Sequence, residues 1–143
     1  MSRRRSILTA LADKLKLIDG NAPYTTNLYG NAYPQLKFWD EVQNFPALYM
    51  SPGHETREYL PGEFKWCFLN VSLKIYCQGE SSQEQLEQLL DDIEICIDAN
   101  RVLEYAPGQT TTEILITSIT TDEGLLDPYA VGEINLLVRY DYQ

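Results

Sequence analysis

The chain has 143 residues, of which 44% are hydrophobic and 11% aromatic, which is enough for one domain with a buried core. Its net charge of −10 argues against a nucleic-acid-binding protein, because phosphate contacts need clustered lysine and arginine. No stretch approaches the ~20 apolar residues of a membrane span, and no secretory signal is visible. We therefore expect a soluble, cytoplasmic single domain over residues 1–143, without membrane contact.

The charge is divided unevenly along the chain. Residues 1–16 carry five basic side chains and one acidic one, a local net charge of +4, so the rest of the chain carries −14. Arg3, Arg4 and Arg5 open the basic segment. They form either an ordinary solvated end or a contact for an acidic partner.

Residues 4–19 are predicted to form an amphipathic helix, because apolar residues recur at helical spacing and Gly20 supplies a stop. The apolar stripe consists of Ile7, Leu8, Leu11, Leu15 and Ile18. The following loop-rich region contains two weak strand candidates, Thr26–Tyr29 and Gln35–Trp39. Phe45–Met50 is typical of an edge strand, since a proline stands near its start, and Pro52-Gly53 is expected to end it.

The centre of the chain predicts a long hairpin. Leu60–Glu63 places proline and glycine at the second and third positions of a type II turn. The strand that follows, Phe64–Gln78, alternates along its length and would span roughly 50 Å, so the turn end is expected to project from the domain. Its apolar face consists of Cys67, Leu69, Val71, Leu73, Ile75 and Cys77.

The projecting end of this strand carries three aromatic residues on its second face, Phe64, Trp66 and Phe68. Two interpretations are open. The rings either pack under a neighbouring loop or form a subunit interface, since exposed aromatic patches mark contacts.

Residues 82–100 form the clearest predicted helix, with Ser81 and Glu84 as a capping box. Its core stripe consists of Leu86, Leu89, Leu90, Ile93, Cys96 and Ile97. Its outer face consists of Glu84, Glu87, Asp91, Asp92, Glu94 and Asp98. Like charges at these spacings each cost a few tenths of a kcal/mol, roughly. The face is therefore either merely solvated, or a surface that repels polyanions or meets a basic partner.

Two strands, Thr111–Thr121 and Glu133–Tyr142, are predicted after this helix. The loop between them contains Leu125 and Leu126, a modest contact signal. The order of elements favours an α+β domain, with two main helices packed on one face of an antiparallel or mixed sheet.

No constellation of residues predicts catalysis. His54 is the only histidine and is expected in a loop, and the three cysteines fall at apolar positions typical of buried free thiols in a reducing compartment. Phosphate-binding glycine loops and zinc spacings are absent from the sequence. We therefore expect no catalytic, cofactor or metal site, and a function performed by surfaces.

The order of elements resembles one family over nearly the whole chain. An N-terminal helix, a tyrosine-rich segment, the run Phe45-Pro46-Ala47-Leu48-Tyr49, a hairpin with Pro61-Gly62 and a long strand come first. A helix and two strands ending in Val138-Arg139-Tyr140 follow. This arrangement is similar to the tail terminator, or tail completion, proteins of long-tailed bacteriophages, the group typified by the lambda tail terminator.

The resemblance implies a structural virion protein, assembled in the host cytoplasm and located at the junction of tail and neck. Such proteins form a hexameric ring of identical subunits that caps the tail tube protein, stops its polymerisation and offers a docking surface to the head and its neck proteins. DNA later passes through without specific binding. The aromatic residues and the two leucines are then candidates for the subunit interface, and Glu84, Glu87, Asp91, Glu94 and Asp98 for an acidic lumen or partner face.

Two other functions fit the sequence. A head–tail joining or neck protein could use a related fold. An acidic inhibitor that mimics DNA is suggested by the carboxylate stripe on the second helix.

Overall fold

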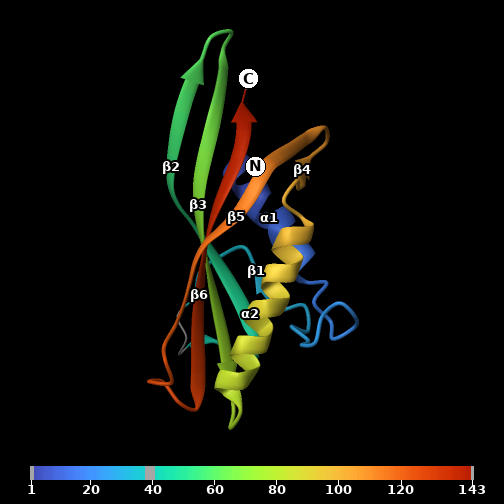
Figure 1. The fold of residues 1–143 in the computed structure, drawn as a ribbon, viewed down its shortest axis with the longest axis vertical. Coiled ribbons are helices and arrows are strands. Elements are labelled where there is room, and N and C mark those ends of the chain that lie inside the picture. Colours follow the sequence, from blue (N-terminus) through green and yellow to red (C-terminus); the bar gives the residue numbers. More distant parts are fainter. Residues whose placement is uncertain (1, 38–40, 143) are drawn as a thin grey trace.

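The computed structural model describes residues 2–37 and 41–142. The elements are α1 (Arg3–Leu15), β1 (Ala32–Tyr33), β2 (Ala47–Leu60), β3 (Phe64–Gln78), α2 (Ser82–Ala99), β4 (Glu104–Ala106), β5 (Gln109–Thr121) and β6 (Tyr129–Tyr142). The strands form one six-stranded sheet in the order β1-β2-β3-β6-β5-β4 (Figure 1). Since β1 pairs parallel with β2 and the other neighbours pair antiparallel, the prediction of an α+β fold with a mixed sheet is confirmed.

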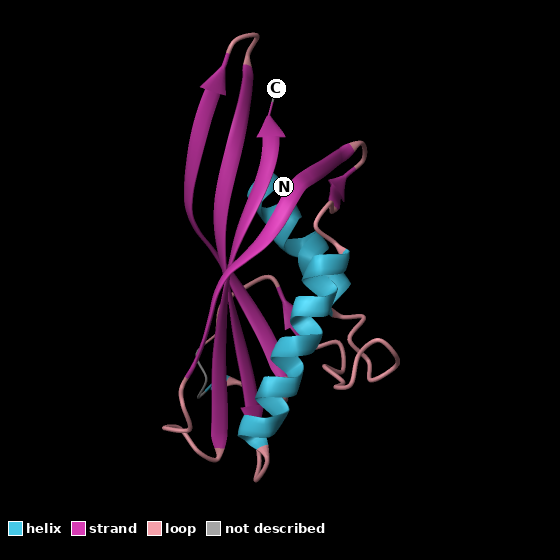
Figure 2. Cartoon of the chain, viewed as in Figure 1, coloured by secondary structure: helices cyan, strands magenta, loops and turns pink. Residues whose placement is uncertain are grey.

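The core is built on β3, whose bounds match the prediction. Successive side chains of a strand point to opposite faces, and the six residues of its predicted apolar face are all buried. They belong to one hydrophobic cluster that also takes side chains from α1, α2 and β6. Figure 2 shows α2 running alongside the long strands.

α2 buries the whole apolar stripe predicted for it, and α1 buries its predicted stripe up to Leu15, while Ile18 is buried beyond the end of the helix. α1 ends at Leu15 rather than at residue 19, because the Leu17 and Ile18 amides bond three residues back and tighten the chain into turns. Ser2 caps its start, with the hydroxyl accepting a hydrogen bond from the Arg5 amide at 3.2 Å. The capping box predicted for α2 is wrong, since the Ser81 side chain makes no cap hydrogen bond.

β2 differs most from the prediction. Pro52-Gly53 does not end it, because a register shift between Pro52 and Glu55 absorbs the irregularity and the ladder with β3 continues to Leu60. Its first residues are not an edge, since Leu48 and Tyr49 pair with β1. His54 therefore lies in a strand, exposed, and not in a loop.

The loop between β2 and β3 consists of Pro61, Gly62 and Glu63, because Leu60 pairs with Phe64. Gly62 has a φ of 85°, which the third position of a type II turn requires. Glu63 also has a left-handed φ, of 64°. Figure 1 shows this loop at one extreme of the molecule.

Some short segments were mispredicted. Neither β1 nor β4 is predicted from the sequence, because two or three residues show no periodicity. The Thr26–Tyr29 strand is wrong, since Asn27 forms only an isolated bridge with Asp19. In the Gln35–Trp39 candidate the first three residues are not in a strand, and the last two lie outside the described residues.

The three cysteines are free and buried, as predicted. Burial raises the pKa of the Cys77 thiol to about 12, so it stays protonated and unreactive at neutral pH. Neither helix in the described part of the chain is long and apolar enough to cross a bilayer.

Candidate assembly surfaces

The first candidate surface, which we call the aromatic patch, consists of Phe64, Trp66 and Phe68 near the closed end of the hairpin. All three residues are half-buried. The Arg139 guanidinium of β6 lies 4.0 Å from the centre of a Trp66 ring, and Phe64 meets Trp66 edge-on with ring centroids 5.0 Å apart. A guanidinium over an aromatic face is an attractive contact. The cover over Trp66 therefore comes from a neighbouring strand.

A shallow hollow continues the aromatic patch along the same face of the sheet. It has a volume of about 210 Å³ and is lined by Phe68, Glu113, Leu115, Leu137 and Arg139. Phe68 pairs with Arg139 and Leu115 with Leu137, so these side chains project to one side. Leu115 remains 36% exposed. A mainly apolar hollow that one cation and one anion also line suits contact with another protein.

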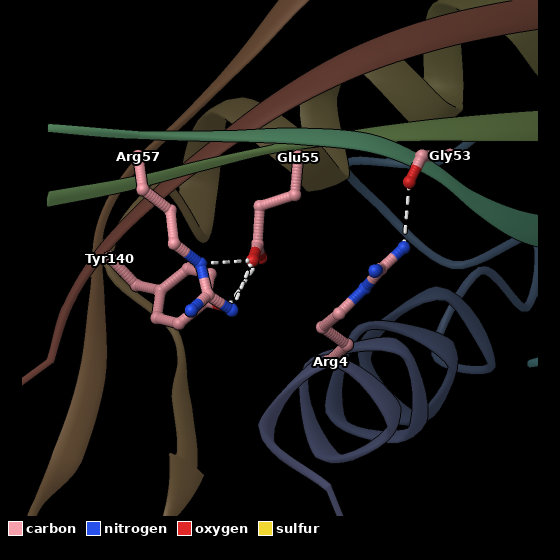
Figure 3. Close-up of polar contacts among 5 residues, drawn as sticks. All are labelled: Arg4, Gly53, Glu55, Arg57 and Tyr140. Carbon is pink, nitrogen blue, oxygen red and sulfur yellow. Dashed lines mark hydrogen bonds and ion pairs between the residues drawn. The ribbon is translucent and has the colours of Figure 1, made fainter.

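A polar network lies on the opposite face of the hairpin, close to the start of α1 (Figure 3). Arg57 donates hydrogen bonds to Glu55 Oε2 from Nε at 3.0 Å and from Nη2 at 2.8 Å. The Tyr140 hydroxyl donates to Oε1 of the same carboxylate at 2.5 Å. The Glu55 side chain is only 5% exposed, so this charged group joins β2 to β6 inside the protein.

The electrostatics of the network follow from these contacts. Burial by itself raises the pKa of Glu55, but the hydrogen bonds from Tyr140 and Arg57 and the charges of Arg57 and Arg4 outweigh it. The pKa of Glu55 is therefore held below its ordinary value. Burial, followed by the hydrogen bond to the carboxylate, raises the pKa of Tyr140.

The arginines of the predicted basic contact make bonds within the chain. Arg4 Nη2 donates to the Gly53 carbonyl at 2.6 Å, which Figure 3 shows beside the network. Arg5 Nη1 donates to the Pro34 carbonyl at 2.6 Å. Arg3, Arg4 and Arg5 are all half-buried. The contacts of Arg4 and Arg5 attach the start of α1 to β2 and to the loop that precedes it.

The second candidate surface, which we call the acidic face, lies on the outer side of α2. Its members are Glu84, Glu87, Asp91, Glu94 and Asp98, all exposed. Spacings of three and four residues place them on neighbouring turns of one side of the helix. Asp98 forms an ion pair with Arg101 at 3.3 Å.

Asp92 does not belong to the acidic face, so this part of the prediction is wrong. It is 2% exposed. Its carboxylate accepts hydrogen bonds from the backbone amides of Thr25, at 3.1 Å, and Thr26, at 2.7 Å, and from the Thr26 hydroxyl. These donors make burial of the carboxylate tolerable. Its spacing was a usable signal, because Asp92 lies three residues after Leu89 and four before Cys96 on the core stripe.

The leucine loop, which contains Leu125 and Leu126, lies at the other end of the sheet from the aromatic patch. It leads into β6, which begins opposite Gln78 at the end of β3. Asp122 shapes the loop by accepting hydrogen bonds from the Leu126 and Val131 amides, both at 3.0 Å. Leu125 is 84% exposed and Leu126 is half-buried. The leucines and the aromatic patch therefore do not form one continuous surface.

Sequence reasoning missed the Glu55–Arg57–Tyr140 network. No local pattern links its members across the strands, because 85 residues separate Tyr140 from Glu55. Within residues 2–37 and 41–142, no three histidine, cysteine, aspartate or glutamate side chains form a group that could hold a metal ion.

Comparison with known proteins identifies the family of the chain. The family model described as "Bacteriophage Tail Tube Terminator Protein" matches residues 1–143. The chain is 41% identical to the tail tube terminator protein p142 of Escherichia phage T5, over 98% of this chain and 94% of that protein. Its fold is similar to that of a chain from the virion of a native gene transfer agent particle, with a TM-score of 0.64, 9% identity and 95% of each chain covered. The chain therefore belongs to the bacteriophage tail tube terminator proteins, which are structural components of the virion tail and not enzymes.

Proposed function

We propose that this protein forms a ring of identical subunits, a hexamer, on the end of the tail tube. The ring ends polymerisation of the tube protein and presents the surface on which the head, with its neck proteins, docks. Family membership supports the role at the tail, and favours a terminator over a neck protein or a DNA mimic. The ring itself is supported by one observation, the aromatic patch on a hairpin whose loop lies at one extreme of the molecule (Figure 1). Such an arm can reach a neighbouring subunit and bury its rings there.

The other candidate surfaces receive matching roles in this proposal. The acidic face of α2 lines the channel through which DNA passes, or it meets a basic partner. The cation beside this face is Arg101, which is paired with Asp98, so the face does not neutralise phosphate. Leu125, at the far end of the sheet, is available to a different partner from the one that meets the hairpin. Arg3–Arg5 are half-buried, and Arg4 and Arg5 already bond to the Gly53 and Pro34 carbonyls. They contribute to an acidic partner contact through their remaining donors.

Capping of purified tail tubes tests the proposal. We expect the unmodified protein to form rings on tube ends in negative-stain images and to halt elongation. Trp66→Ala and Phe68→Ala should weaken capping at least ~10-fold, because aromatic residues at the centre of an interface often contribute ~2 kcal/mol or more. Their thermal unfolding midpoints should fall by only a few degrees, since the patch is half-buried in the free chain.

Leu17→Ala is the matched control, because Leu17 is 60% exposed and lies outside all the candidate surfaces. It should cap like the unmodified protein. Rings that form normally with both aromatic variants would remove the patch from the interface. Tubes that elongate past the unmodified protein would contradict the proposed function itself.

A further inference from the structure

Two stretches of strand edge have no partner within the described residues. β5 pairs with β6 on one side, whereas on its other side only Gln109 and Thr110 pair with β4. β2 pairs with β1 at two residues only, and Arg4 bonds to its edge at Gly53. We call the remaining stretches the β2 free edge, His54–Leu60, and the β5 free edge, Glu113–Thr121.

The β5 free edge lacks the usual protection of an edge strand. Ile114–Thr121 contains no charged residue, proline or glycine, and Leu115 and Ile119 are 36% and 40% exposed. Unpaired backbone groups invite another strand, so proteins ordinarily blunt long edges with lysine or proline. A register shift between Ile116 and Ser118 interrupts the ladder but leaves residues 118–121 regularly paired with β6. This composition is typical of an edge that another strand covers.

The directions of the strands fit a contact between copies of the chain. The pairs β2–β3, β3–β6 and β6–β5 are all antiparallel, so β2 and β5 run in opposite directions. Copies that are related by rotation about an axis roughly parallel to the strands keep their strand directions. β2 of one copy therefore meets β5 of another as an antiparallel partner. Because each edge is used once, the contact is heterologous and repeats until a ring closes.

The positions of the two free edges also fit a closed β-sheet that runs through all subunits of a ring. In the ladder Glu55 lies level with Leu69, Val138 and Ile114, so the β2 free edge is displaced along the strands from the β5 free edge. The displacement between their centres is about five residues, or ~16 Å. Four long strands are ~19 Å wide at ~4.8 Å each. Strands in closed barrels tilt by about 35–45° from the axis, and such a tilt staggers neighbouring copies by about the observed displacement.

We propose that the β5 free edge of one subunit pairs antiparallel with the β2 free edge of the next. This pairing joins the sheets of all subunits into one closed β-sheet. The pairing rests on the proposed ring and specifies which segments join its subunits. It also explains why Ile114–Thr121, a stretch of strand edge without charged residues, persists in a chain with a net charge of −10. Main-chain hydrogen bonds would supply the join, and the aromatic patch would add side-chain contacts above it.

Cysteine cross-linking in the assembled ring tests the pairing. Thr56→Cys on β2 is combined in turn with Leu115→Cys, Ser118→Cys and Thr120→Cys on β5, which share one face by register. Paired residues of antiparallel strands lie ~4.5–5.5 Å apart at their Cα atoms, within disulfide reach. After oxidation, we expect at least one combination to give disulfide-linked species larger than the dimer, visible as a ladder of bands on a denaturing gel. The three native thiols are buried, so we expect them to form no cross-links.

The controls separate this pairing from other arrangements. Thr56→Cys combined with Gln88→Cys, on the exposed side of α2, should give no ladder. A single-cysteine variant that yields dimers would show edge pairing about a two-fold axis and overturn the proposal. Capping rings without a cross-link in any combination would also overturn it while leaving the proposed function standing. Tubes left uncapped by the unmodified protein would defeat both.

Hydrogen exchange of the unmodified protein gives a readout that needs no variant. The outward-pointing amides of both free edges should exchange quickly in the free chain and slow by at least ~10-fold in the ring, because backbone pairing protects them. Unchanged exchange at both edges after assembly would overturn the proposal.

Discussion

The two halves of β3 continue one alternating pattern but are stabilised differently. From Leu69 to Cys77 the inner face is buried against both helices in the main core. Toward Phe64 the same face lies beside the Glu55–Arg57–Tyr140 network, while the outer face carries the aromatic patch. One half depends on apolar burial and the other on hydrogen bonds, charge and a stacked guanidinium. Alternation thus reveals that a strand has two faces, but it does not reveal what covers them.

The largest effect that this comparison predicts is in the core half. Leu73→Ala should lower the free energy of unfolding by ~2–5 kcal/mol, because the side chain is fully buried and its removal leaves a cavity. Denaturant unfolding followed by circular dichroism measures the loss. A change below ~1 kcal/mol would show that the helix-covered half is not the main source of stability.

A smaller and more local effect is expected in the hairpin half. Glu55→Gln should cost ~1–3 kcal/mol, because the buried Tyr140 hydroxyl and the partly exposed Arg57 guanidinium lose a charged acceptor. Hydrogen exchange should rise mainly in the hairpin and near Tyr140. Exchange that rises equally in α2 would contradict the division into two halves.

The same variant has a predicted pH signature. The folded-state pKa of Glu55 is depressed, so its stabilisation is present above the unfolded-state pKa of about 4.3 and is lost as pH falls through the folded-state pKa. The stability difference between the unmodified protein and Glu55→Gln should therefore shrink when the pH is lowered below about 4. Unfolding curves at neutral and acidic pH measure it, and a difference that grows on acidification would contradict the assignment.

The smallest effect is expected on the outer side of α2, above the core half. Glu94→Lys should change the free energy of unfolding by no more than ~0.5 kcal/mol, in the stabilising direction, because Asp91 and Asp98 lie three and four residues away. The matched substitution Gln88→Lys controls for an added lysine on the same helix. A clear loss of stability with Glu94→Lys would show that the acidic face supports the fold rather than a contact.

Long periodic elements were predictable and long-range polar contacts were not. β3 and the stripe of α2 follow from spacing alone, since fifteen residues in strict alternation leave few other structures. The continuation of β2 through Pro52-Gly53 depends on its pairing with β3, which local preferences do not contain. The spacing of Asp92 on the core stripe signals its burial, but nothing local identifies Thr26 and Tyr140 as the distant donors to Asp92 and Glu55. Of the candidate surfaces, the sequence located the side chains but not the Arg139 cover over Trp66.

The undivided length of β3 has a mechanical consequence. Core and hairpin share a single backbone from Phe64 to Gln78, with β6 hydrogen-bonded beside it over nearly all of that length. No flexible linker separates them, so force applied at the loop is transmitted to the body through peptide bonds and ladder hydrogen bonds. A subunit built in this way moves as one rigid body. A hairpin bound by a neighbouring subunit would therefore set the tilt of the whole subunit, because the hairpin does not bend independently.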